Sequence, residues 1–265
     1  GLLTNSLALL SDAGHMLSDA AALGLSLIAF KIGEKAANSN KTYGYKRFEI
    51  LAAFINGITL LGISVYIFWE AYHRFLAPPN VDAAMIVIAI IGLIVNIIVA
   101  WILMKGDTSE NLNMRSAFLH VLGDMLGSVG AIVAGLLIVF FEWNMADPIA
   151  SVLVAVLIII SGWRVTKDSI HILMEGKPHH INIQHVEKEL LNLEGVTSIH
   201  DLHIWTITSD FPALSCHLTV KRNVDRDHLL QKASQLLREH FHLKHSTIQI
   251  EGEHANIHDE EDNCN

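Results

Sequence analysis

Two histidine–aspartate pairs stand inside strongly apolar stretches of the sequence. His15 and Asp19 are four residues apart, and His120 and Asp124 repeat that spacing much later in the chain. On a helix, residues four apart lie on one face, so each pair can present an imidazole and a carboxylate together. Two imidazoles and two carboxylates would supply the ligands of a tetrahedral divalent-metal site, a set that suits Zn²⁺ better than Mg²⁺ or Ca²⁺.

Each pair could instead be a local hydrogen bond that holds helices together. The repetition of the pair favours the metal site, because an ionisable side chain inside a membrane is costly and is usually functional. Four glycines surround the second pair: Gly123, Gly127, Gly130 and Gly135. Small residues at this spacing let helices approach closely, so they predict packing of the second pair's helix on the first pair's helix, or else a dimer face.

The elements that must position these pairs are membrane helices. Hydrophobic residues make up 51% of the 265 residues and charged residues only 17%, against about 25% charged in ordinary globular chains. A bilayer core needs about 20 mostly apolar residues per helix. The transmembrane domain is therefore predicted over residues 1–177, with spans at about 7–31, 48–72, 82–104, 115–141 and 147–170, and Asp147-Pro148 is expected to cap the last span.

Basic residues alternate between the loops and set the orientation. The segments 31–49, 105–115 and 164–177 together carry ten Lys and Arg residues, whereas 70–82 and 142–147 carry only Arg74. By the positive-inside rule the first group, and with it the C-terminal domain, lies in the cytoplasm. The start of the chain is then on the far side, which predicts that an earlier segment is missing.

The rest of the chain has a different composition. Residues 178–265 hold 14 acidic and 7 basic residues, and 13 of the 16 histidines lie from position 171 onward. Apolar periodicity predicts helices at 183–193 and 225–241 and strands at 202–208, 213–220 and 247–250. This αββαβ order predicts a small two-layer α+β domain over 178–252, followed by an acidic, histidine-bearing tail, 253–265, that we expect to be disordered.

Histidines and carboxylates also recur in and beside the predicted strands of this domain, at His200, His203, His217, His242, His245, Glu251 and Glu253. Any one of these histidines is more often solvated than metal-bound, but the whole set indicates a metal site. The two cysteines, Cys216 and Cys264, are too few for a disulfide framework or a four-cysteine zinc module. The net charge of −9 argues against nucleic acid as a partner.

Several strings resemble the cation diffusion facilitator family of zinc and cadmium exporters. The most specific are 6–19 (SLALLSDAGHMLSD), 43–57 (YGYKRFEILAAFING), 117–130 (AFLHVLGDMLGSVG), 147–149 (DPI) and 200–205 (HDLHIW). The resemblance covers essentially the whole chain. It implies a six-helix membrane fold with the first helix largely missing here, a ferredoxin-like, metallochaperone-like cytoplasmic domain, and a homodimer.

The resemblance also implies residue roles. It assigns the transport site to His15, Asp19, His120 and Asp124, and a cytoplasmic Zn²⁺ site to His200, His217, His245 and Glu251, with His185 as a further candidate. Two departures are visible in the sequence. The loop 38–47 has no histidine or carboxylate, so the extra zinc site of some bacterial members should be absent, and the short 105–112 loop favours a bacterial plasma membrane.

These observations predict a multi-pass cell-membrane antiporter that exports Zn²⁺, with Cd²⁺ or Co²⁺, in exchange for protons, and that is not an enzyme. No ATP-hydrolysis motif is present, so an ion gradient is the expected driving force. One alternative is a membrane-anchored metal sensor whose helices do not transport. Another, an intramembrane metal-dependent hydrolase, lacks an HExxH helix.

Overall fold

The structure is a computed structural model that describes residues 5–77, 84–104, 112–208 and 211–253. Within its helices some side chains, including those of His15, Asp19 and His120, lie outside the described part. The chain divides into two compact units. One comprises residues 1–28 and 52–167, and the other comprises 29–51 and 168–265.

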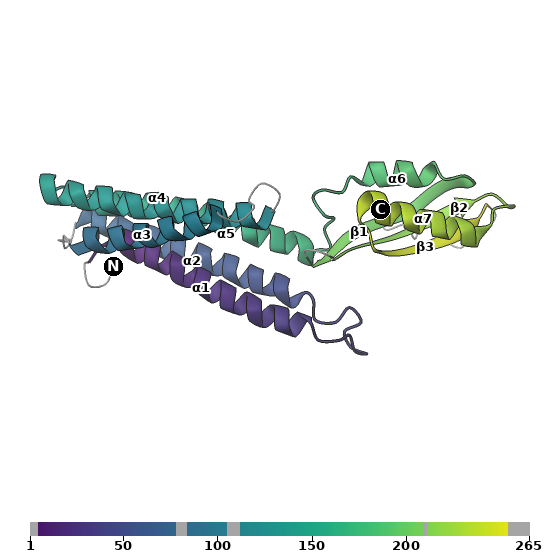
Figure 1. Cartoon of the computed structure of the whole chain (residues 1–265), viewed down its shortest axis with the longest axis horizontal. Helices are drawn as coiled ribbons and strands as arrows, with labels where there is room; N and C mark the ends of the chain where they lie inside the picture. Colours follow the sequence, from purple (N-terminus) through teal and green to yellow (C-terminus); the bar gives the residue numbers. More distant parts are fainter. Residues whose placement is uncertain (1–4, 78–83, 105–111, 209–210, 254–265) are drawn as a thin grey trace. The chain divides into compact units, whose positions relative to one another are not determined.

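Among the described residues, five long helices form the membrane part of the chain, and Figure 1 shows their arrangement. They are α1 (Leu7–Gly33), α2 (Phe48–Leu76), α3 (Ala84–Met104), α4 (Leu112–Phe141) and α5 (Ala146–Leu173). Within the described residues, α2, α3, α4 from Asp124 onward, and α5 are long and apolar enough to cross a membrane. The predicted class, a polytopic helical membrane protein with a C-terminal α+β domain, is confirmed.

Small residues pack the interior where α1, α3, α4 and α5 meet. The buried cluster there is mostly alanine: Ala8, Leu9, Met85, Ala89, Ala131, Ala134, Ile138, Ala146 and Ala150. Lipid is as apolar as these side chains, so membrane helices associate through close van der Waals packing rather than through the hydrophobic effect. The outer faces of the helices carry large exposed apolar side chains instead, as a lipid-facing surface requires.

Helices α2 and α5 cross closely at a pair of glycines. A Cβ added to Gly57 would overlap the Thr166 hydroxyl oxygen and would lie 3.2 Å from the Gly162 carbonyl oxygen. A Cβ added to Gly162 would lie 3.0 Å from Cβ of Leu60. Glycine at both positions is therefore what allows the two backbones to touch.

A buried carboxylate joins the starts of two helices. Asp147 is fully buried in the first turn of α5, and its Oδ2 accepts a 2.7 Å hydrogen bond from the backbone N–H of Leu7. The Ala8 N–H, at 3.2 Å, and the Ser6 hydroxyl donate to its Oδ1. The expectation that Asp147 caps its own helix is wrong: α5 begins at Ala146, and the carboxylate instead satisfies the free N–H groups at the start of α1.

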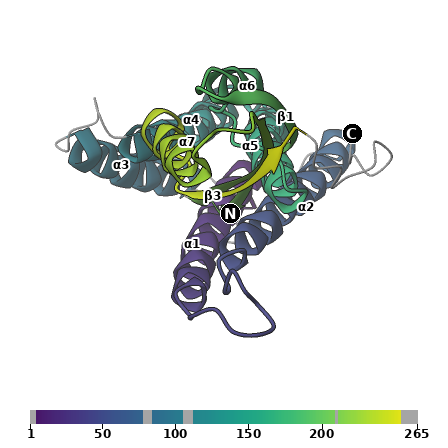
Figure 2. The same ribbon diagram turned by 90° about the vertical axis from the view of Figure 1, so that its right-hand side faces the viewer.

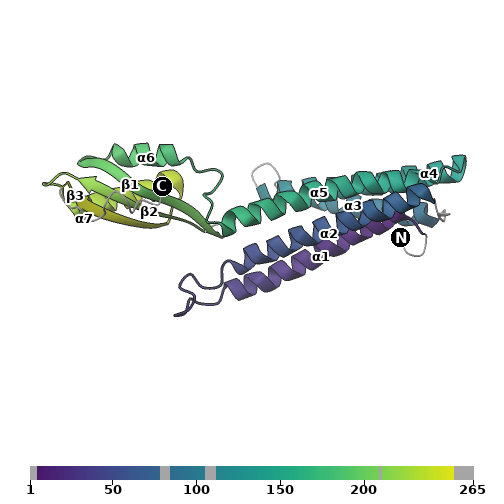
Figure 3. The ribbon, with the colours of Figure 1, turned by 180° about the vertical axis from the view of Figure 1, so that it is seen from behind.

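Arg74, near the end of α2, completes this junction. Its Nη1 donates to the Asn5 carbonyl oxygen at 2.6 Å and lies 3.8 Å from Asp147 Oδ2. Its Nε forms an ion pair with Glu70 Oε1 at 2.9 Å. The ends of α1, α2 and α5 are thus held together, and α1 and α2 run side by side from this junction in Figures 1 and 3.

The cytoplasmic domain has the predicted order αββαβ, with α6 (Ile183–Leu191), β1 (Val196–Thr208), β2 (Phe211–Val220), α7 (Arg226–Phe241) and β3 (His245–Gly252). The sheet order is β1-β2-β3, with β1 antiparallel and β3 parallel to β2. Both helices contribute to one core against the sheet (Figure 2). Each helix begins after a residue type that favours helix starts. The side chains of Asn182 and Asp225 accept hydrogen bonds from backbone N–H groups in the first turns of α6 and α7.

Strand β1 begins at Val196, six residues earlier than predicted. A register shift lies between His200 and His203, and Asp201 there has a left-handed backbone with φ 52°. An irregularity of this kind breaks the alternation of buried and exposed residues. The alternation that reveals a strand in the sequence is therefore recognisable only from Leu202 onward.

The glycine crossing of α2 and α5 yields a stability prediction. Gly57→Ala should destabilise the protein by about 1–3 kcal/mol, because the new methyl group overpacks a closed contact. Gly62→Ala is the matched control on the same helix, where an added Cβ meets no heavy atom within 4 Å. Thermal unfolding of the purified full chain in detergent measures both. Equal melting temperatures for the two variants would contradict the crossing.

Candidate metal sites

Three potential ligands converge on the face of the cytoplasmic sheet opposite its helices. His200 on β1 pairs directly with His217 on β2, and Glu251 lies on β3, two residues beyond the partner of His217. One ligand atom from each lies within 4.8 Å of the others. His217 Nδ1 is 3.0 Å from Glu251 Oε1, and His200 Nε2 is 3.5 Å from Glu251 Oε2.

The pleat of β2 explains why this face carries the potential ligands. Cys216 and Leu218 point into the core, so His217 between them points the other way. Glu251 is only 5% exposed. A buried carboxylate is costly unless it is paired, and a cation held between it and the two imidazoles would remove that cost. Two nitrogens and one oxygen with a fourth position open is an arrangement that suits Zn²⁺.

Two further polar side chains support the ligands, and sequence analysis did not identify either. Gln249 Nε2 donates a 2.7 Å hydrogen bond to Glu251 Oε1. Asp201 Oδ2 lies 3.9 Å from His217 Nε2, while its Oδ1 lies 2.8 Å from His203 Nε2. A carboxylate behind a ligand histidine orients the ring. Gln249 could have been identified from the sequence, because residues two apart on a strand share a face and Gln249 is two residues from Glu251.

The structure brings together three of the four residues expected here, and His245 lies apart from them. It starts β3, in register with Ala213, and its ring lies 5.5 Å from that of Phe211 and 5.8 Å from that of Tyr43. Six residues separate it from Glu251, which is about 20 Å along an extended strand. The two residues share a strand face but cannot share an ion.

His185, a further candidate ligand, and Cys216, which was not a candidate, both lie outside this cluster. His185 is on α6, where its Nε2 is 3.8 Å from Glu189 Oε1 and its ring packs edge-on against Phe241. Cys216 is buried in the core, and burial raises the pKa of its thiol to about 12. A thiol that remains protonated is a poor metal ligand.

The membrane pairs lie on α1 and α4, both of which are continuous helices through these positions. Asp124 is half-buried, and the side chains of His15, Asp19 and His120 lie outside the described part. The two helices touch one turn away. Asp12 on α1 is buried, and its Oδ1 is 3.3 Å from the position that a Cβ on Gly127 would occupy. Of the two roles predicted for the glycines, Gly127 thus serves helix packing.

The contact between Asp12 and Gly127 relates the depths of the backbone at the four positions of the two His–Asp pairs. α1 and α4 run antiparallel, because α4 ends just before α5 and Asp147 of α5 contacts the start of α1. With a rise of about 1.5 Å per residue, His15 and Asp124 both lie about 4.5 Å from the contact in the cytoplasmic direction. Asp19 and His120 both lie about 10.5 Å from it, so each histidine is level with an aspartate of the other helix.

Both parts of the chain match known protein families. Residues 1–174 match the family described as Cation efflux transmembrane domain, and residues 178–253 match the family described as Cation efflux protein, cytoplasmic domain. A cadmium, cobalt and zinc/H⁺-K⁺ antiporter of Bacillus subtilis is 57% identical over 264 residues, covering 98% of this chain and 84% of that protein. Zinc transporter ZitB of Escherichia coli is 42% identical over 253 residues, covering 95% and 80%.

A third relative and one solved structure come from the same bacterium. The metal cation efflux system protein CzcD of Cupriavidus metallidurans is 41% identical over 253 residues, covering 95% of this chain and 80% of that protein. The structure of the metal-bound C-terminal domain of this CzcD is 38% identical, covers 27% of this chain and 99% of its own, and has a TM-score of 0.26.

The cytoplasmic cluster yields a prediction about zinc affinity. Gln249→Leu should weaken Zn²⁺ binding about 10–100-fold, because Glu251 loses the group that orients it. His245→Ala, on the same strand, should leave the affinity unchanged. Calorimetric titration of residues 178–253, which contain their own hydrophobic core, measures both. If His245→Ala weakens binding as much as Gln249→Leu, the three-residue cluster is wrong.

Proposed function

The chain belongs to the cation efflux family, and from this premise we propose that it exports Zn²⁺ from the cytoplasm through a membrane site made of His15, Asp19, His120 and Asp124. The observation that carries the proposal is the Asp12–Gly127 contact between α1 and α4. It supports a single site, because it sets each histidine level with an aspartate of the opposite helix. The proposed ligands are thus two imidazoles and two carboxylates at two adjacent depths.

The identity of the cargo follows from the ligand chemistry. Imidazole nitrogens with carboxylate oxygens in fourfold coordination suit Zn²⁺, whereas Mg²⁺ and Ca²⁺ prefer shells made of oxygen alone. Cd²⁺ and Co²⁺ can use the same ligands, and the Bacillus subtilis relative is named for cadmium, cobalt and zinc. The relatives are named as transporters, which favours export over the alternatives of a membrane-anchored sensor and a hydrolase.

Protons are the proposed counter-ion. Only neutral histidine and ionised aspartate are good ligands, so a metal ion entering the site displaces protons. When the site faces outward, release of the metal lets protons bind to the same side chains and return inward. Competition for one set of ligands then gives antiport without a separate proton path.

The cytoplasmic cluster of His200, His217 and Glu251 is proposed as a second, regulatory Zn²⁺ site. It lies in the domain after the membrane helices, and its three protein ligands leave one position open for exchange. We further propose that the protein acts as a homodimer. The face of the sheet that carries the cluster has no helix of its own domain over it within the described residues.

The four-ligand site predicts the effect of removing single ligands. His15→Ala or Asp124→Ala should abolish zinc transport, because a tetrahedral site that loses one of four ligands binds its ion poorly. His73→Ala is the matched control, since this exposed histidine near the end of α2 packs edge-on against Trp69. Zinc uptake into proteoliposomes with an imposed pH gradient measures all three, with expression checked in parallel. Near-normal transport by either ligand variant would refute the site.

The coupling mechanism predicts a shift in pH dependence. His15→Asp should keep metal binding but move its pH dependence to lower pH, because a carboxylate ordinarily titrates at about 4 and an imidazole at about 6.5. Apparent zinc affinity of parent and variant, measured between about pH 5 and 8, tests this. External acid should accelerate efflux by the parent. Superimposable pH curves would mean that His15 does not carry the exchanged proton.

A further inference from the structure

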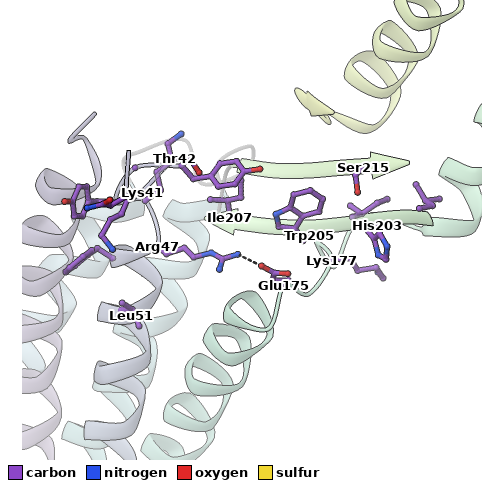
Figure 4. Close-up of a pocket in the computed structure, with 18 of the residues that line it drawn as sticks. Lys41, Thr42, Arg47, Leu51, Glu175, Lys177, His203, Trp205, Ile207 and Ser215 are labelled. Carbon is purple, nitrogen blue, oxygen red and sulfur yellow. Dashed lines mark hydrogen bonds and ion pairs between the residues drawn. The ribbon is translucent and has the colours of Figure 1, made fainter. Parts of the chain in front are cut away.

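A cavity of about 900 Å³ lies in the second unit, between the loop before α2 and strand β1 (Figure 4). The loop contributes residues 40–47, the first turn of α2 contributes Phe48 and Leu51, and β1 contributes residues 202–205 and Ile207. Its volume is in the range of sites that hold small organic molecules. No role proposed above uses this cavity.

Positive charge dominates the cavity wall. Lys41, Lys46, Arg47 and Lys177 line it, and Glu175 is the one carboxylate among the described residues of its lining. The Arg47–Glu175 contact is 3.4 Å between side chains that are 39% and 67% exposed. Such an exposed pair is weak, so the guanidinium remains able to bind another anion.

The lysines sit against aromatic rings that hold them at the cavity. Lys46 Nζ lies 4.0 Å from the ring centre of Phe211, and Lys41 Nζ lies 5.4 Å from that of Tyr45. Cation–π contacts of this kind position an ammonium group without neutralising its charge. The cavity therefore keeps an excess of positive charge at fixed places.

The same wall is also apolar on the side of the membrane helix. Phe48 and Leu51 line the cavity and are 39% and 41% exposed. From Ile50 the helix continues as an uncharged run of residues to Trp69. The cavity thus lies where α2 enters the bilayer, and its basic loop lies on the cytoplasmic side.

We propose that this cavity binds the headgroup of an anionic phospholipid of the cytoplasmic leaflet. The phosphate would lie among Lys41, Lys46 and Arg47, and the glycerol and first acyl carbons would lie against Phe48 and Leu51. Basic groups next to a spanning helix attract anionic lipids. A soluble phosphate ester would use the same cations but would have no use for the exposed apolar side chains.

The test uses the delipidated full chain in detergent and two short-chain lipids, dioctanoyl-phosphatidylglycerol and dioctanoyl-phosphatidylcholine. The parent should bind the first and not the second. The double variant Lys41→Gln/Lys46→Gln should bind phosphatidylglycerol about tenfold or more weakly, since each basic group contributes to attraction of the anionic lipid. The matched control Lys221→Gln/Arg222→Gln removes the same charge from the turn after β2 and should bind like the parent.

Each other result overturns the proposal. Parent-like binding by the double variant would show that the cavity is not the site, and equal loss in the control would show attraction by net charge alone. Binding of inorganic phosphate or glycerol 1-phosphate as tight as that of the lipid would identify a soluble ligand. If the double variant fails to remain monodisperse, Lys41→Gln alone replaces it, since that exposed side chain makes only a ring contact among the interactions described.

Discussion

The fully buried carboxylate of Asp147 is the contact on which the membrane part depends. In a bilayer the free N–H groups at a helix start have no water to bind, so they must find a partner within the protein. Asp147 on α5 accepts those of Leu7 and Ala8 on α1, and Arg74 of α2 adds its charge beside it. The position of α1 along the membrane normal is thereby fixed relative to α5. The depth at which Asp12 of α1 meets Gly127 of α4 is fixed with it.

The proposed transport site needs the two helices to keep this relative depth. A slip of α1 by one turn would move His15 and Asp19 about 5.4 Å away from the level of the proposed ligands on α4. Alanines in the shared interior and the glycine crossing of α2 and α5 leave little room for such a slip. The same principle holds in the cytoplasmic domain, where strand register brings His200 opposite His217 and Glu251 next to them.

Much of this architecture was predictable from local patterns. Uncharged runs of bilayer length marked the helices, loop lysines gave the orientation, and alternation along β2 placed His217 on the face away from the core. The resemblance to the cation diffusion facilitator family is confirmed by matches over both parts of the chain. One prediction failed because a contact joins distant segments: Asp147 was expected to cap its own helix, and it accepts backbone N–H groups of α1 instead. His245 was expected in one site with Glu251, but the length of β3 separates the two residues.

The sequence by itself determined which residue types could bind a metal and on which elements they lie, because helix and strand periods are local properties of the chain. Tertiary structure decided which of those residues meet. The register shift at Asp201 between β1 and β2 and the contact of Asp12 with Gly127 both depend on how one element packs against another. No periodicity encodes that packing, because it is fixed by close contacts between side chains far apart in the sequence.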